Sequence, residues 1–105
     1  MPAYMIVAAN ITNREEFIAS YGAVTGPLVE KYGGKYVLRG PGLHLLEDSF
    51  GAGNLQDGSM AISEWRNKDA ALKFWNSPEY AEAKTLREGL AECLVMLIEA
   101  PKIGE

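Results

Sequence analysis

The feature that most constrains the fold is the order in which short apolar runs and helix signals alternate along the chain. Each apolar run has the length of a β-strand, and each helical stretch between them has a cap and an apolar stripe. The predicted strands are residues 4–9, 35–39, 59–65 and 94–98, with a further strand piece at 43–47. Right-handed β-α-β crossovers then give an α+β sandwich of the ferredoxin-like β-α-β-β-α-β type, with an antiparallel sheet and helices on one face.

The first helical stretch has a clear start, a stripe and an end. Thr12 and Glu15 have the spacing of a capping box, which predicts that the helix begins there. Gly26-Pro27 predicts a kink, and Gly33-Gly34 predicts the helix end. The stripe that we expect to pack on the sheet consists of Phe17, Tyr21, Val24, Leu28 and Tyr32.

The octet KFWNSPEY at residues 73–80 predicts a corner between two helices. Asn67 caps the first helix, while Ser77 caps the second with Pro78 at its first position. Phe74 and Trp75 are adjacent, so they cannot point the same way on a helix. We therefore expect one of them in the core and the other at a pocket or an interface.

The composition indicates one domain of 105 residues, of which 48% are hydrophobic. A chain this short leaves one face of its sheet uncovered, and a second copy of the chain would bury that face. This predicts a homodimer. The net charge of −4 and the scattered basic residues argue against nucleic acid or a membrane as a partner. Cys93 lacks a disulfide partner and no stretch is long enough to span a bilayer, so we expect a cytoplasmic protein.

Three blocks carry a family resemblance: MPAY at residues 1–4, YGGKYVLRG at 32–40 and FWNSPEYAEAKTLR at 74–87. The chain resembles a family of small bacterial proteins known as a domain of unknown function, within the dimeric α/β-barrel superfamily. This resemblance implies a ferredoxin-like protomer whose bare sheet face packs on a second copy. Relatives in the superfamily include cofactor-independent monooxygenases, lactone isomerases and haem enzymes, so the fold raises the prospect of a pocket without naming a reaction.

The chain departs from the family pattern at two places. Trp65-Arg66-Asn67 stands where a Phe-Pro-Ser turn is usual, and Ala81 stands where a Gln is common. Asn67 keeps a capping side chain, whereas any role of that Gln is lost.

Glu64 is the candidate general base, because it ends an otherwise apolar strand face formed with Met60 and Ile62. Partial burial there predicts a raised pKa. Two alternatives stay open: Glu64 lies at the strand end in water, or it pairs with Arg39.

A second candidate group follows the restarted helix. Tyr80, Lys84 and Arg87 share a stripe while Ala83, Leu86 and Leu90 turn to the core. Arg87 would hold a carboxylate or phenolate; the competing interpretation is a solvated helix face. The full set of predicted substrate-binding residues is Tyr4, Tyr36, Arg39, Trp75, Tyr80 and Arg87.

The sequence predicts neither a metal site nor a cofactor. His44 and Cys93 are the only residues of their kinds, which excludes the usual zinc ligand sets. An axial haem contact through His44 is less favoured than an exposed strand histidine.

Two hypotheses remain. In the first, a homodimer has a pocket that binds, and oxidises or isomerises without a cofactor, a small aromatic or lactone-like acid. In the second, the protein is a non-catalytic ligand-binding or dimer-assembly module whose aromatic residues fill the core. A cavity with polar edges between helices and sheet favours the first, and a filled core favours the second.

Overall fold

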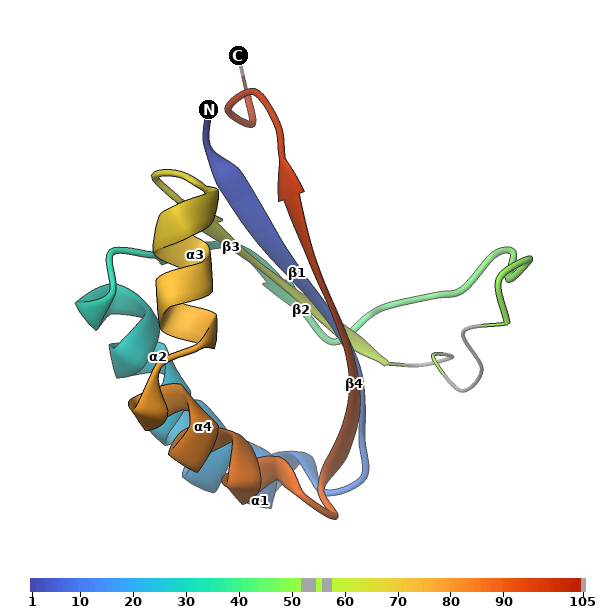
Figure 1. Cartoon of the computed structure of the whole chain (residues 1–105). Helices are drawn as coiled ribbons and strands as arrows, with labels where there is room; N and C mark the ends of the chain where they lie inside the picture. The colour runs from blue at the N-terminus through green and yellow to red at the C-terminus, as the bar shows by residue number, and fades with distance from the viewer. Residues whose placement is uncertain (52–54, 56–57, 105) are drawn as a thin grey trace.

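A computed structural model describes residues 1–51, 55 and 58–104. Its four-stranded antiparallel sheet has the order β2-β3-β1-β4, with all helices on one face (Figure 1). The chain therefore has the predicted ferredoxin-like α+β fold. The strands are β1 (Ala3–Ile11), β2 (Lys35–Gly40), β3 (Ser59–Trp65) and β4 (Ala91–Glu99).

The helical layer begins with α1 (Arg14–Phe17), a π-helical turn (Ile18–Gly22) and α2 (Ala23–Lys31). It continues with α3 (Lys68–Trp75), α4 (Pro78–Lys84) and a 3₁₀ turn (Thr85–Arg87). The caps of α3 and α4 are as predicted: the Asn67 side chain accepts from the Ala70 amide and the Ser77 hydroxyl from the Tyr80 amide. Gly33 ends α2 with a φ of 90°, as expected for a C-terminal glycine.

The predicted capping box at Thr12 is wrong. Asn13 is the N-cap of α1, and its side chain accepts from the Glu16 amide at 3.1 Å. The Thr12 hydroxyl instead donates to the Leu90 carbonyl at 3.1 Å, which ties this loop to the start of β4. Asn is a strongly preferred N-cap residue. Because the helix starts one residue later than predicted, the Thr12 and Asn13 side chains are both hydrogen-bonded.

The predicted stripe of the first helix is wrong in its middle. The helix contains a π-helical turn that the regular period does not predict, and Gly26-Pro27 lies inside α2. A π-turn adds a residue to the helix, so the inward positions become Thr25 and Val29. Val24 is 43% exposed as a result.

The predicted strand piece at 43–47 is also wrong, because the structure has no strand there. Proline at 41 follows the last residue of β2, and β3 starts only at Ser59, so this stretch has no β3 residue to pair with. The stretch leaves the body of the domain on the side away from the helices (Figure 1), and Leu46 is 89% exposed. The predicted Gly51–Gly58 loop lies mostly outside the described residues.

The core lies between sheet and helices, around Trp65, which is 1% exposed. Its indole N–H donates to the Ser63 hydroxyl at 2.9 Å, so the one polar atom of the ring is satisfied. Phe74 is the inward member of the Phe74-Trp75 pair, as the predicted corner requires. The buried cluster comprises Met5, Val29, Trp65, Ala71, Phe74, Tyr80 and Ala83.

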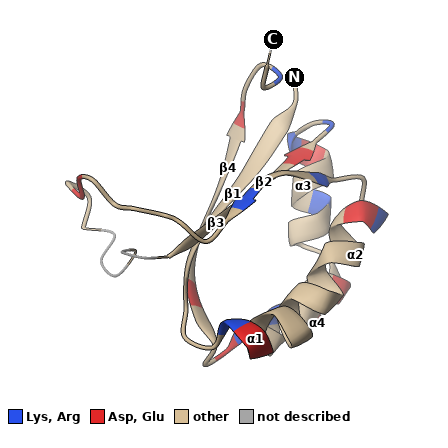
Figure 2. Cartoon of the chain, turned by 180° about the vertical axis from the view of Figure 1, so that it is seen from behind, with Lys and Arg blue, Asp and Glu red and all other residues tan. Residues whose placement is uncertain are grey.

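The other face of the sheet is bare and largely apolar. Leu38 on β2 and Leu94, Met96 and Ile98 on β4 are each 43–50% exposed. Charged residues of both signs lie mainly on the helices and near the strand ends (Figure 2). No helix in the described part of the chain is long and apolar enough to cross a membrane.

Candidate functional site

A cavity of about 580 Å³ lies between the helical layer and the sheet. The inward residues of β1 and β3 form its floor, and the π-helical turn and α2 form much of its wall. Its apolar lining includes Met5, Val7, Phe17, Val29 and Phe74. A predominantly apolar cavity of this size with a few polar groups is typical of a small-molecule site.

Three of the predicted site residues line this cavity: Tyr36, Arg39 and Tyr80. Tyr36 and Arg39 come from β2, where the Arg39 guanidinium carbon lies 4.6 Å from the centre of the Tyr36 ring. This geometry is a cation–π contact, which holds both side chains in place. Among the described residues, Arg39 forms no ion pair, so its charge is available to a ligand.

Tyr80 belongs to a cluster of polar groups at the α4 end of the cavity. Its hydroxyl oxygen is 2.8 Å from that of Tyr21, and Arg87 donates from Nη1 to the Tyr80 oxygen at 3.3 Å. Burial is the main cause that raises the pKa of Tyr80, and the hydrogen bond with Tyr21 acts in the same direction. Tyr80 therefore stays protonated at neutral pH and acts as a neutral group.

The residues of the predicted stripe along α4 point to different places in the structure. Arg87 reaches the cavity cluster, whereas Lys84 places its Nζ 4.7 Å from the centre of the Trp75 ring. Trp75 contacts Tyr80 from outside the cavity, with ring centres 5.2 Å apart. Leu86 is 39% exposed, so the prediction that it turns to the core is wrong: the 3₁₀ turn Thr85–Arg87 changes the helical period there.

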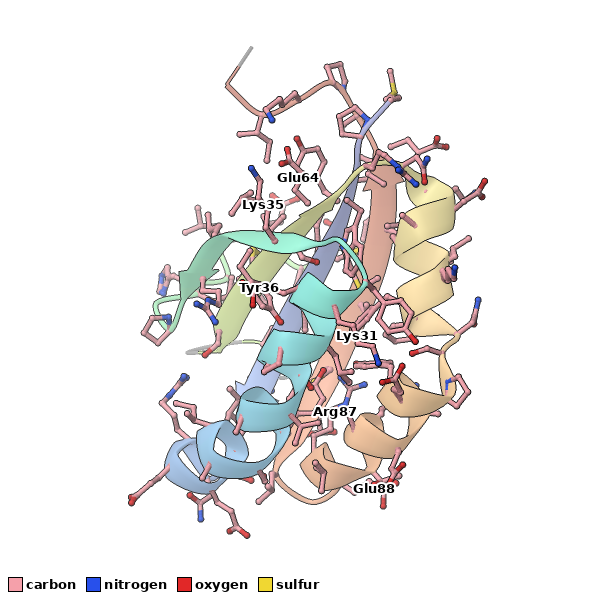
Figure 3. The ribbon with its side chains drawn as sticks, turned by 90° about the vertical axis from the view of Figure 1, so that its left-hand side faces the viewer. Lys31, Lys35, Tyr36, Glu64, Arg87 and Glu88 are labelled. Atoms are coloured by element: carbon pink, nitrogen blue, oxygen red, sulfur yellow. The ribbon has the colours of Figure 1, made fainter. Side chains whose placement is uncertain are left out.

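Glu64 and Tyr4 lie on the opposite face of the sheet from the cavity. They are directly paired across β1 and β3, and side chains alternate along a strand while Met5 and Ser63 face the cavity. The Tyr4 hydroxyl donates to Glu64 Oε2 at 2.8 Å. Figure 3 shows Glu64 beside Lys35 at one end of the sheet, well away from Arg87.

The surroundings of Glu64 lower its pKa, so the predicted rise is wrong. The hydrogen bond from Tyr4 has the largest effect, and the Lys35 and Lys102 ammonium groups lower the pKa further. Their Nζ atoms are 3.4 and 3.8 Å from Oε1. The predicted pairing with Arg39 does not form, since these lysines take its place.

Sequence reasoning did not include Tyr21 or Thr25 among the site residues. Tyr21 was expected in the core stripe, although its spacing gives no sign of a contact with Tyr80. The Thr25 side chain is buried and lines the cavity, and its hydroxyl oxygen has no hydrogen-bond partner among the described residues. The π-helical turn brings it there, and sequence periodicity assumes a regular helix.

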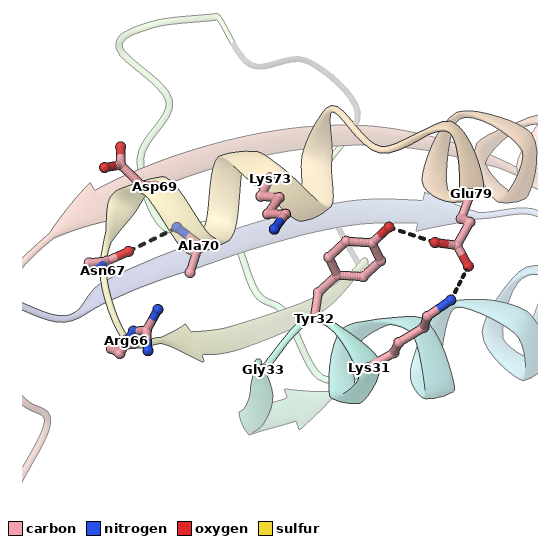
Figure 4. A pocket seen from close by; sticks show the side chains of 9 residues that line it. All are labelled: Lys31, Tyr32, Gly33, Arg66, Asn67, Asp69, Ala70, Lys73 and Glu79. Atoms are coloured by element: carbon pink, nitrogen blue, oxygen red, sulfur yellow. Dashed lines mark hydrogen bonds and ion pairs between the residues drawn. The ribbon is translucent and has the colours of Figure 1, made fainter.

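A second hollow, of about 880 Å³, runs along the surface between the end of α2 and α3 (Figure 4). None of the predicted site residues lines it. Glu79 accepts from Lys31 at 2.6 Å and from the Tyr32 hydroxyl at 2.5 Å, which uses both carboxylate oxygens. These bonds lower the pKa of Glu79 and join α2 to α4. We therefore interpret this groove as a helix junction.

The remaining chemical candidates, His44 and Cys93, are not among the residues that line the cavity. His44 is exposed in the 41–51 stretch, outside any strand. Cys93 is half-buried, and burial raises the pKa of its thiol, so a reactive thiolate is disfavoured. Within residues 1–51, 55 and 58–104, no three His, Cys, Asp or Glu side chains are grouped to hold a metal ion.

Solved structures with the same fold extend over nearly the whole chain. A protein of unknown function from Rhodopseudomonas palustris, RPA0582, is 24% identical with a TM-score of 0.69, covering 96% of this chain and 83% of that one. SnoaB, a cofactor-independent oxygenase from Streptomyces nogalater, is 15% identical with a TM-score of 0.67, covering 99% and 98%. A dimeric ferredoxin-like protein of unknown function from Jannaschia sp. CCS1 is 14% identical with a TM-score of 0.63, covering 95% and 100%.

Sequence comparison gives a family and no characterised relative. None of the curated proteins matches the sequence. One family model, described as a domain of unknown function, matches residues 2–101. The chain therefore belongs to the DUF1330 family.

Proposed function

We propose that this protein is a homodimer that binds a small aromatic or lactone-like acid in the cavity between helices and sheet, and oxidises or isomerises it without a cofactor. The observation that carries the proposal is the cavity itself, with its apolar lining, Arg39 and the buried Thr25 hydroxyl. A polar group buried without a partner costs about 1–3 kcal/mol, and a ligand that accepts its hydrogen bond removes that cost.

The bare face of the sheet supports the homodimer. Leu38, Leu94, Met96 and Ile98 lie exposed over two strands, and a second copy would cover them. The Jannaschia protein of the same fold is described as dimeric.

The chemistry of the proposal takes its support from SnoaB, which shares the fold and is a cofactor-independent oxygenase. Against catalysis, the described residues that line the cavity include no Asp, Glu or His to act as a base. This favours the second candidate, a non-catalytic ligand-binding module that uses the same cavity. Glu64 as the general base stays a prediction.

A binding screen followed by a turnover assay separates the two. We expect native mass spectrometry to retain one ligand per subunit from a panel of small aromatic acids. We then expect oxygen uptake, or conversion followed by chromatography, with the bound compound. Binding without conversion favours the binding module, and no binding by any acid contradicts both candidates.

Two matched variants test the assignment of the site. Arg39→Met removes the unpaired cation at the cavity, and Arg66→Met removes a cation from the surface groove. Only the first should weaken binding. Glu64→Gln tests the predicted general base. If Glu64 is the base, this variant loses turnover and keeps ligand binding.

A further inference from the structure

The Tyr21 and Tyr80 hydroxyl groups together have two protons, and the hydrogen bond between them uses only one. Tyr21 comes from the π-helical turn and Tyr80 from α4, and their oxygens are 2.8 Å apart. Each phenol has one proton, and one proton lies between the two oxygens. The other has no acceptor among the described residues.

Arg87 decides what this spare proton can do. Its Nη1 lies 3.3 Å from the Tyr80 oxygen and 3.5 Å from the Tyr21 oxygen, and a guanidinium can only donate. Its hydrogens occupy lone pairs of both oxygens. The pair is thereby left as a donor toward the cavity, which both tyrosines line.

The other polar groups that line the cavity also include more hydrogen-bond donors than acceptors. The Thr25 hydroxyl is buried without a hydrogen-bond partner among the described residues. Arg14 and Arg39 add positive charge, and no carboxylate is found among the described lining residues. Donors therefore outnumber the side-chain acceptors that could satisfy them.

We propose that the cavity binds acidic phenols and enols as their conjugate bases, with the anionic oxygen at the Tyr21–Tyr80 pair and Arg87 as the residue that positions this pair. This deepens the proposed function and rests on it, since it names the ionisation state and orientation of the ligand. The ligand's O–H bond breaks, its electron pair stays on oxygen, and the proton passes to water. Hydrogen bonds to an anionic oxygen are about twice as strong as those to a neutral one, so the donors favour this form.

The probe for this proposal is 4-nitrophenol, whose phenolate absorbs visible light and whose phenol does not. A spectrophotometric pH titration with saturating protein measures its apparent pKa when bound. We expect this pKa to fall by about one unit relative to free solution, which corresponds to an approximately tenfold preference for the anion. The neutral analogue 4-nitroanisole should bind correspondingly more weakly.

The variants separate positioning from general packing. Tyr80→Phe removes a donor, and Arg87→Met removes the group that orients the pair; both should abolish the shift. Arg87→Lys keeps a donor and should restore part of it. Tyr32→Phe, which removes a phenol that bonds to Glu79, should leave the shift unchanged.

The possible failures are distinguishable. If 4-nitrophenol binds with an unchanged pKa, or if 4-nitroanisole binds equally well, this inference is wrong and the proposed function stands. If neither compound nor any acid of the panel binds, the proposed function fails with it. Should Arg87→Met fail to fold by circular dichroism, Tyr80→Phe and Thr25→Val provide the same test of the donor set.

Discussion

Tyr4 and Glu64 lie opposite each other on β1 and β3, and the phenol donates to the carboxylate at 2.8 Å. The same phenol oxygen accepts from the Ile103 amide at 2.8 Å, so this pair also holds the segment that follows β4. With Lys35 and Lys102 nearby, the Glu64 side chain is only 12% exposed and yet stays ionised.

The first prediction concerns the pH dependence of this pair. The folded-state pKa of Glu64 lies below its unfolded value, so the carboxylate stabilises the fold above the unfolded pKa of about 4.3. This contribution is lost as pH falls through the folded pKa. We expect Glu64→Gln to lower the thermal midpoint at pH 7, and the difference from wild type to shrink toward pH 3. A difference that is constant over this range contradicts the assignment.

Gly34 is predicted to tolerate no side chain. A Cβ there would lie 2.7 Å from the Trp65 ring, which is buried and cannot move aside. Overpacking of this kind costs about 1–3 kcal/mol, so Gly34→Ala should lower the free energy of unfolding measured in urea by that amount. Gly26→Ala is the matched control, since a Cβ at position 26 meets nothing within 4 Å. It lies in α2, where alanine should be neutral or stabilising.

Substitution of Thr25 is predicted to maintain or raise the free energy of unfolding and to weaken ligand binding. Its buried hydroxyl has no partner among the described residues, and Thr25→Val replaces it with a methyl group of similar shape. The free energy of unfolding should stay equal or rise by about 1 kcal/mol. Affinity for 4-nitrophenolate, measured by the same titration, should fall. A fall in stability together with unchanged affinity would show that the hydroxyl has a structural role.

The bare sheet face is predicted to be the dimer interface. Met96→Glu places a charge at the centre of the apolar residues of β4, where burial of an unpaired carboxylate is unfavourable. Sedimentation should report a dimer for wild type and a monomer for this variant. Leu86→Glu, at an exposed leucine of the helical layer, is the control and should stay dimeric.

Local signals in the sequence were sufficient for the order of elements and for most caps. Strand Ser59–Trp65 and the caps at Asn67 and Ser77 depend on alternation and on side chain to backbone hydrogen bonds within a few residues. The strand piece at 43–47 failed because a strand also needs a partner, and pairing depends on where the neighbouring strand starts. The Thr12 box failed for a similar reason, since the Leu90 carbonyl lies 78 residues away.

The candidate site was predictable only in part. Tyr36, Arg39 and Tyr80 line the same cavity, and Arg87 joins them through Tyr80. The pKa of Glu64 shifts in the opposite direction to the one that burial predicts, because Tyr4, Lys35 and Lys102 converge on it from three separate parts of the chain. Such convergence depends on register and tertiary packing, which spacing in one sequence does not contain.

The π-helical turn Ile18–Gly22 has a consequence for how the cavity could change over evolution. Because this turn adds one residue to the helix, Thr25 faces inward and Val24 faces outward. If the same residues formed a regular α-helix without the π-turn, α2 would be rotated by about 100° and Val24 would face the cavity in place of Thr25, since each helical residue turns by that angle. The polarity of this wall is thus encoded in one irregular turn, and a relative that keeps the same residues but forms a regular helix there would present a valine to its ligand.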